Sequence, residues 1–181
     1  MKYLILNTVT IAAVFSMSGC AGHLPKKEYV APSNSDATLQ LGTMPKKIVA
    51  DFYLNETAES CRNFKDSGYV YDWDTANSGG LETLARKLNF AERDEVKSIQ
   101  ASIPAGQPIQ VAAWNSQMGF KCGPVFAQFE PIKAHKYQAY FVMWEKYCRM
   151  EVVDTTDPGK QVLANGFKPI QCKAMIKAAM P

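Results

Sequence analysis

Short segments in which apolar and polar residues alternate dominate the chain between residues 48 and 153. A period of two puts every second side chain on the same face, as in a β-strand that buries one face. The pattern occupies residues 48–54, 99–103, 109–113, 125–129, 137–144 and 147–153, and turn residues such as Pro104 and Pro131 separate the segments. The sequence therefore predicts a mainly β fold, an antiparallel β-sandwich or, as the alternative, a small barrel.

One segment has helical rather than strand periodicity. Its apolar residues recur at positions i, i+3, i+4 and i+7, so they share one face of a helix: Leu81, Leu84, Ala85 and Leu88. We expect one short helix here, packed on a sheet. A further short helix is expected at the end of the chain, over 173–179.

The N-terminus has the pattern of a targeting segment. Lys2 provides a positive start, and an almost unbroken apolar stretch of twelve residues follows from Leu4 to Phe15. A helix needs roughly 20 residues to cross the ~30 Å hydrocarbon core of a membrane, so this stretch is too short. It fits the apolar region of a secretory signal, which is removed from the mature chain.

The residues after this stretch, Met17-Ser18-Gly19-Cys20, resemble the lipobox of bacterial lipoproteins, although that family usually has Leu, Val or Ile where Met17 stands. The resemblance implies cleavage after Gly19, a thioether-linked diacylglycerol on Cys20 and acylation of the new amine. Two or three acyl chains, at ~0.8 kcal/mol per buried CH₂, anchor a protein stably in a membrane. Ala21, where an Asp would mark retention in the inner membrane, implies the outer membrane. The alternative is an ordinary secretory signal in which the cysteine has no role.

These features divide the chain into three parts. We predict a cleaved signal peptide over 1–19, a lipidated N-terminus and flexible tether over 20–36, and a single disulfide-stapled β domain over 37–181. Lys2 is one of 20 basic residues, so the mature chain has 19 basic and 17 acidic residues, a formal charge of +2. Its basic residues form no cluster, which a nucleic-acid surface needs, so we expect no nucleic-acid partner.

Four cysteines remain besides Cys20, and an even number in an exported chain predicts two disulfides. No CxxC spacing occurs, so we expect no metal site and no cofactor. Of the three possible pairings we favour Cys61–Cys122 with Cys148–Cys172, because the second bond would pin the C-terminal segment onto a strand. Each bond stabilises the fold by ~2–4 kcal/mol.

Three segments within residues 99–154 resemble a loose class of small periplasmic lipoproteins: "IPAGQPIQVAAW", "CGPVFAQFEP" and "KYQAYFVMWEKYCRMEVVD". In that class a strand ending in Pro-Ala-Gly precedes a cysteine-bearing strand, and a Phe-x-Pro turn leads to an aromatic hairpin. The resemblance implies a β-sandwich facing the periplasm. It implies no catalytic residue, because the class shares no chemistry.

Residues with catalytic side chains form no recognisable constellation. Of the two histidines, His23 lies in the predicted tether and His135 in a polar turn, where we expect it to be solvated. No GxSxG motif is present. The acidic residues in polar stretches are expected to be solvated: Asp72, Asp74, Glu92, Asp94 and Glu95. Residues 154–157 carry oxygen ligands but lack EF-hand spacing, so they predict a hairpin turn rather than a calcium site.

Two aromatic features stand out. Tyr69, Tyr71 and Trp73 fall at strand spacing and predict a core-facing aromatic side. Residues 137–144 are apolar on both faces, so this strand must be covered twice. Either the helix at 81–88 covers the side of Tyr140 and Trp144, which we favour, or that side is an exposed recognition patch. This patch is the candidate binding site.

The leading hypothesis is a non-enzymatic envelope lipoprotein, anchored by acyl chains on Cys20 in the outer membrane. It would face the periplasm and bind or support an envelope protein or cell-wall component. One alternative is a ligand-binding or enzyme-inhibitor lipoprotein comparable to the lipoprotein inhibitors of lysozyme. The other is a hydrolase that uses a pair of carboxylates.

Overall fold

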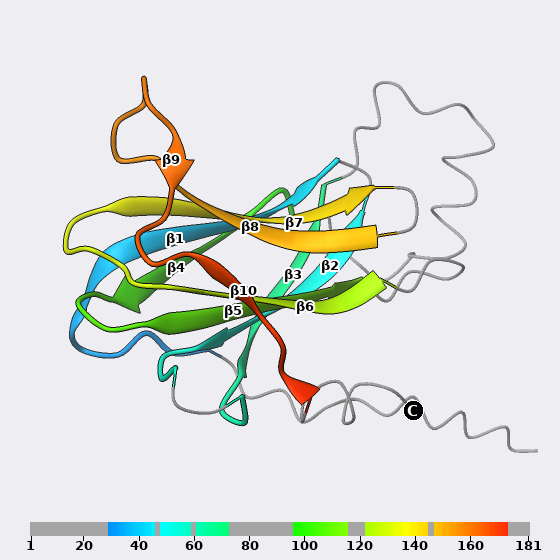
Figure 1. Ribbon diagram of the computed structural model, residues 1–181, viewed down its shortest axis with the longest axis horizontal. Coiled ribbons are helices and arrows are strands. Elements are labelled where there is room, and N and C mark those ends of the chain that lie inside the picture. The colour runs from blue at the N-terminus through cyan, green and yellow to red at the C-terminus, as the bar shows by residue number, and fades with distance from the viewer. Residues whose placement is uncertain are drawn as a thin grey trace, which may run out of the picture.

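The computed structural model describes residues 29–45, 48–58, 61–72, 96–115, 122–144 and 147–173. They form two five-stranded sheets with almost no helix (Figure 1). The first, named here the β1 sheet, has the strand order β4 (Ile99–Pro104), β1 (Ser35–Met44), β7 (Lys136–Trp144), β8 (Tyr147–Asp154) and β9 (Val162–Leu163). The second, the β2 sheet, has the order β10 (Lys168–Ile170), β6 (Cys122–Phe129), β5 (Ile109–Asn115), β2 (Val49–Asn55) and β3 (Lys65–Tyr71).

Neighbouring strands pair antiparallel in both sheets, except for the parallel pair of β1 and β7 in the β1 sheet. Its register runs from Thr38 opposite Lys136 to Met44 opposite Val142. Strands β1 and β7 therefore end at the same end of the molecule. Within the described strands neither sheet closes on itself. The predicted mainly β fold is confirmed, and the barrel alternative is wrong.

One hydrophobic cluster lies between the two sheets and draws side chains from both. The inward residues predicted for the strand at 48–54 are confirmed, because Ile48, Ala50, Phe52 and Leu54 are all buried. From the facing sheet, Leu39 and Leu41 of β1 and Phe141 of β7 are fully buried in the same cluster. The alternation of apolar residues thus determines which face of each strand meets the other sheet.

Tyr29 attaches the start of the described chain to both sheets. Its backbone N–H donates to the carbonyl of Asp66 in β3 at 2.7 Å, and its hydroxyl donates to the carbonyl of Ser102 in β4 at 2.7 Å. Burial, together with the charge of Glu56, raises the pKa of Tyr29 to about 12. Tyr29 is therefore part of the folded domain, whereas the sequence predicted a flexible tether up to residue 36.

The four cysteines form two disulfides, as predicted, but the predicted pairing of Cys61 with Cys122 and of Cys148 with Cys172 is wrong. Cys61 bonds to Cys172, and Cys122 bonds to Cys148. The first bond holds the segment after β10 against the outer surface of the β2 sheet, where Cys172 packs with Ala112 and Phe126. The second bond joins β6 of the β2 sheet to β8 of the β1 sheet. The predicted pairing failed because the C-terminal segment lies along the β2 sheet and not along the hairpin of β7 and β8.

The strand predicted around Tyr69 and Tyr71 is β3, but its inward residue is Val70. Tyr71 is buried on the opposite face, in a small cluster with Val49 and Tyr69. The helix predicted at 81–88 lies outside the described residues, as does all but the first residue of the one at 173–179. In the part of the chain that is described, no helix is both long and apolar enough to cross a membrane.

Candidate binding face of the β1 sheet

The outer face of the β1 sheet carries exposed aromatic rings at one end of the hairpin formed by β7 and β8. Trp144 and Tyr147 are direct cross-strand neighbours, and they are 60% and 58% exposed. The prediction that Trp144 is buried beneath a helix is wrong. The pairing of β1 with β7 ends at Val142, so Trp144 extends beyond β1 and has a strand neighbour on one side only.

Further along the same face, a chain of hydrogen bonds crosses the strands. The hydroxyl of Tyr140 donates to Oε1 of Gln138, and Nε2 of Gln138 donates to Oε1 of Gln40 at 2.8 Å. Nε2 of Gln40 then donates to the hydroxyl of Ser98, just before β4, at 3.0 Å. These contacts join β7, β1 and the start of β4, and they fix which way each glutamine amide points.

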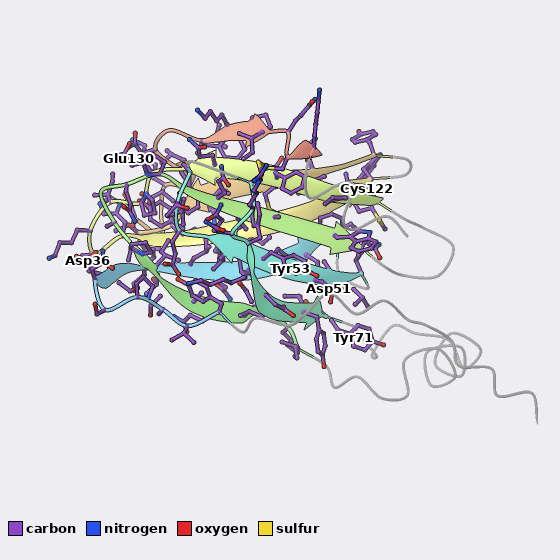
Figure 2. All side chains as sticks on the ribbon, turned by 90° about the horizontal axis from the view of Figure 1, so that it is seen from below. Asp36, Asp51, Tyr53, Tyr71, Cys122 and Glu130 are labelled. Carbon is purple, nitrogen blue, oxygen red and sulfur yellow. A yellow bond between two sulfur atoms is a disulfide. The ribbon has the colours of Figure 1, made fainter. Side chains whose placement is uncertain are left out.

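A cavity of about 400 Å³ opens beside this hydrogen-bonded chain. Its lining comes from the end of β1, from β7 and from the segments next to β3 and β4: Gln40, Gly42, Thr43, Met44, Pro45, Asp72, Lys97, Ser98, Gln138 and Tyr140. Asp72 directly follows Tyr71, and Figure 2 shows Tyr71 and Cys122 toward one end of the sheets, with Asp36 and Glu130 at the other. The cavity thus lies toward the end of the molecule at which β1 and β7 finish.

Gly42 leaves room for this cavity. It sits opposite Tyr140 in the parallel register, and a Cβ atom placed on it would be 3.6 Å from two ring atoms of Tyr140. That distance is an ordinary contact, so the glycine itself is not required by the backbone. A longer side chain at position 42 would project over the ring of Tyr140 and occupy the cavity.

The charged groups of this face include an ion pair on β8. Nη2 of Arg149 lies 2.7 Å from Oε1 of Glu151, and Glu151 is the cross-strand neighbour of Tyr140. At the cavity itself, Lys97 and Asp72 contribute one charge of each sign. The lining of the cavity is therefore close to neutral, and most of its polar groups are amides and hydroxyls.

His135 lies at the opposite end of the β1 sheet. The sequence predicted a solvated side chain, but His135 contacts two other residues. Its Nδ1 is 2.6 Å from Oδ2 of Asp154, and its ring stacks on Tyr137. Burial of Asp154 opposes ionisation, but hydrogen bonds from Thr156 and His135 outweigh it, so the pKa of the Asp154 carboxyl lies below its ordinary value. The pair ties the turn before β7 to the end of β8.

Several sequence candidates are not brought together. Asp72 lines the cavity, whereas the other acidic candidates, together with His23 and Cys20, lie outside the described residues. Residues 154–157 form a turn leading into β9, which pairs antiparallel with β8, as predicted. Among the residues described, no group of three or more His, Cys, Asp or Glu side chains could hold a metal ion.

The sequence interpretation missed the polar half of this face. Gln40, Ser98 and Gln138 come from three segments that are distant in the chain. The parallel register of β1 with β7 brings the two glutamines together, and the antiparallel pairing of β1 with β4 brings Ser98 next to Gln40. One signal was present: Ala37, Leu39 and Leu41 alternate with Thr38 and Gln40, which is the pattern of a strand with a polar outer face.

The fold and the site define a mainly β protein of two sheets with one polar and aromatic outer face. No protein-family model matches the chain, and comparisons with curated proteins and with solved structures found no match.

Proposed function

We propose that this protein is a non-enzymatic, lipid-anchored lipoprotein of the bacterial envelope that binds another envelope component through the outer face of the β1 sheet. In this proposal the two sheets form a β-sandwich that faces the periplasm, and the anchor lies in the outer membrane. The observation that carries the proposal is the outer face itself: Trp144 and Tyr147 are exposed, and a polar cavity adjoins Tyr140.

The N-terminal sequence supports the anchor. An apolar stretch of twelve residues, Leu4 to Phe15, is followed by Met17-Ser18-Gly19-Cys20, which resembles a lipobox. The two disulfides are compatible with a location outside the cytoplasm. Tyr29, which is docked on both sheets, follows Cys20 by nine positions, and nine residues span at most about 30 Å. The anchor would therefore hold the domain close to the membrane surface.

The aromatic residues support a binding role. Large exposed aromatic side chains are enriched where proteins bind partners, and they provide much of the binding energy there. Trp144 and Tyr147 lie at the end of the same sheet face as Tyr140. Met44 of β1, which is 48% exposed, lies opposite Val142, between Tyr140 and Trp144 along β7. Exposed apolar and aromatic side chains that lie near one another are typical of interaction surfaces, so these residues support the proposed binding face.

Site-specific photocrosslinking in intact cells tests the binding face. A photoreactive residue replaces Tyr140 or Trp144, and the control carries it at Lys168, an exposed position of β10 in the other sheet. We expect envelope components to be captured from positions 140 and 144 and not from 168. Equal or no capture at all three positions would contradict the proposed binding face.

Metabolic labelling tests the anchor separately. The Cys20→Ser variant should not incorporate labelled palmitate and should keep its signal peptide, because the thioether needs the cysteine sulfur. The Cys61→Ser variant is the control and should be labelled normally, since Cys61 belongs to a disulfide. Palmitate on the Cys20→Ser protein would show that the lipobox interpretation is wrong.

A further inference from the structure

The cavity beside Tyr140 has the size of a small-molecule site. Its volume of about 400 Å³ falls within the ~300–1,000 Å³ range of ligand pockets, which combine apolar surface with a few placed polar groups. Here the apolar surface comes from Tyr140 and Met44, and the polar groups come from Gln40, Gln138 and Ser98.

The polar groups are oriented before any ligand arrives. In the chain from Tyr140 to Ser98, each glutamine uses one N–H as a donor and its carbonyl oxygen as an acceptor. A primary amide has two N–H donors and two lone pairs on its oxygen, so Gln40 and Gln138 each keep a second donor and a second acceptor. Groups held in one orientation lose less entropy when they bind a ligand.

We propose that this cavity binds a pyranose unit of an envelope glycan; this inference rests on the proposed function and names its ligand class. A pyranose presents hydroxyl groups, and often acetamido groups, that both donate and accept hydrogen bonds. The amides of Gln40 and Gln138 and the hydroxyl of Ser98 match them. The C–H groups of a sugar ring pack against an aromatic ring, which Tyr140 supplies at the same cavity.

The composition of the cavity favours a sugar over a protein partner. A stable protein interface buries roughly 800 Å² on each partner and has an apolar core. The cavity is concave, and amides, hydroxyls and one charge of each sign supply its polar lining. Trp144 lies four residues beyond Tyr140 on the same strand face, about 13 Å away at the rise of a β-strand. It offers a second aromatic surface to further units of the same glycan.

Binding of two soluble saccharide preparations to the purified full-length lipoprotein in detergent tests the proposal. One is the mixture of muropeptides released from peptidoglycan, and the other is the lipid-free polysaccharide released from lipopolysaccharide. Isothermal calorimetry measures each Kd. We expect one of the two to bind, and the one that binds identifies the source of the glycan.

Four variants locate the binding. Tyr140→Ala and Gln138→Ala should each weaken binding about tenfold, as expected for a lost ring contact or hydrogen bond. Gly42→Val should weaken it at least as much, because the added methyl groups enter the cavity while every polar lining group stays. Gln100→Ala is the matched control: Gln100 is an exposed glutamine opposite Gln40 on β4, outside the cavity, and the Kd should stay within twofold.

The outcomes separate this inference from the proposed function. Binding of neither saccharide, or binding that the folded Tyr140→Ala and Gly42→Val proteins retain, overturns the glycan site. If neither saccharide binds while crosslinking from Tyr140 captures a protein, the binding face stands and only the glycan is wrong. A melting temperature equal to that of the unaltered protein establishes that a variant is folded. If the Tyr140→Ala protein does not fold, Tyr140→Phe replaces it; this variant keeps the ring and removes the hydroxyl that donates to Gln138.

Discussion

The outer faces of the two sheets differ in what covers them. On the β2 sheet, the segment that contains Cys172 packs over Ala112 and Phe126, and the bond to Cys61 fixes it there. Polar outward residues of that sheet are buried as well: Nδ2 of Asn55 donates to Oε1 of Gln110 at 2.9 Å, and both residues are at least 97% buried.

On the β1 sheet, the outward side chains stay largely accessible. Trp144 and Tyr147 are more than half exposed, and the hydrogen-bonded glutamines border a cavity. The comparison teaches that the same alternation of residues along a strand leads to a second core on the outer side of one sheet and to an accessible face on the other. The difference lies in the C-terminal segment, which is pinned to the β2 sheet.

The largest effect is expected on the covered face. Phe126 is 4% exposed, and its ring lies 5.8 Å from that of Phe64, centroid to centroid. Phe126→Ala should lower the free energy of unfolding by ~3–5 kcal/mol, because the substitution leaves a cavity beneath the C-terminal segment. Urea denaturation measures the change. A loss below ~1 kcal/mol would mean that the cover does not pack tightly on this sheet.

The disulfides give the next largest effect, and they are not equal. Cys61–Cys172 closes a loop with a sequence separation of 111, and Cys122–Cys148 one of 26. The chain-entropy model therefore assigns the first bond about 1 kcal/mol more stabilisation than the second. Urea denaturation of the two double Cys→Ser proteins, in which one bond is removed at a time, checks the order. Equal losses of unfolding free energy in the two variants would contradict the entropic account. Peptide mapping without reduction checks the pairing itself.

Much of this fold could be predicted from the sequence, because alternation reports on burial. Ile48, Phe52 and Leu54 were assigned to the core correctly, and the strands at 99–103 and 109–113 are β4 and β5. The pairing of the cysteines could not be derived this way. Loop entropy depends only on sequence separation, whereas the position of Cys172 depends on which sheet the C-terminal segment crosses.

The candidate site was predicted only in part, for a similar reason. The apolar residues on both faces of β7 indicated that Tyr140 and Trp144 need either a cover or a partner. Hydrophobicity is the same in both cases, so the sequence could not choose between them. The exposure of Trp144 comes from the register, because β1 ends at Met44, opposite Val142. The contact of Gln40 with Gln138 likewise depends on a parallel pairing between strands 98 residues apart.

A third, smaller effect concerns how the accessible sheet is held at its other end. The pKa of Asp154 is lower in the folded protein than its ordinary value, so its contribution to stability is present above the unfolded pKa of about 3.9. The contribution is lost as the pH falls through the folded pKa. Asp154→Asn should therefore lower the free energy of unfolding by ~1–2 kcal/mol at pH 7. Below about pH 4 the variant should lose less stability on acidification than the unaltered protein does.

Urea denaturation between pH 3 and pH 7 measures this effect. Glu151→Gln is the control, because Glu151 pairs with Arg149 on the surface, where an ion pair contributes only ~0–1 kcal/mol. An Asp154→Asn protein with the same pH dependence as the unaltered protein would show that the contact with His135 does not stabilise the turn before β7.

The smallest effect on stability is expected at Trp144, and it decides whether the two faces really differ. The ring is 60% exposed, so Trp144→Ala should change the free energy of unfolding by no more than ~0.5 kcal/mol. Val142, two residues earlier on the same face and 9% exposed, is the matched control, and Val142→Ala should cost about 1 kcal/mol or more. If Trp144→Ala instead costs ~3–5 kcal/mol, the ring is part of a core and the β1 sheet is covered like the β2 sheet. A stable Trp144→Ala protein that no longer captures its envelope component would place the residue in the binding face.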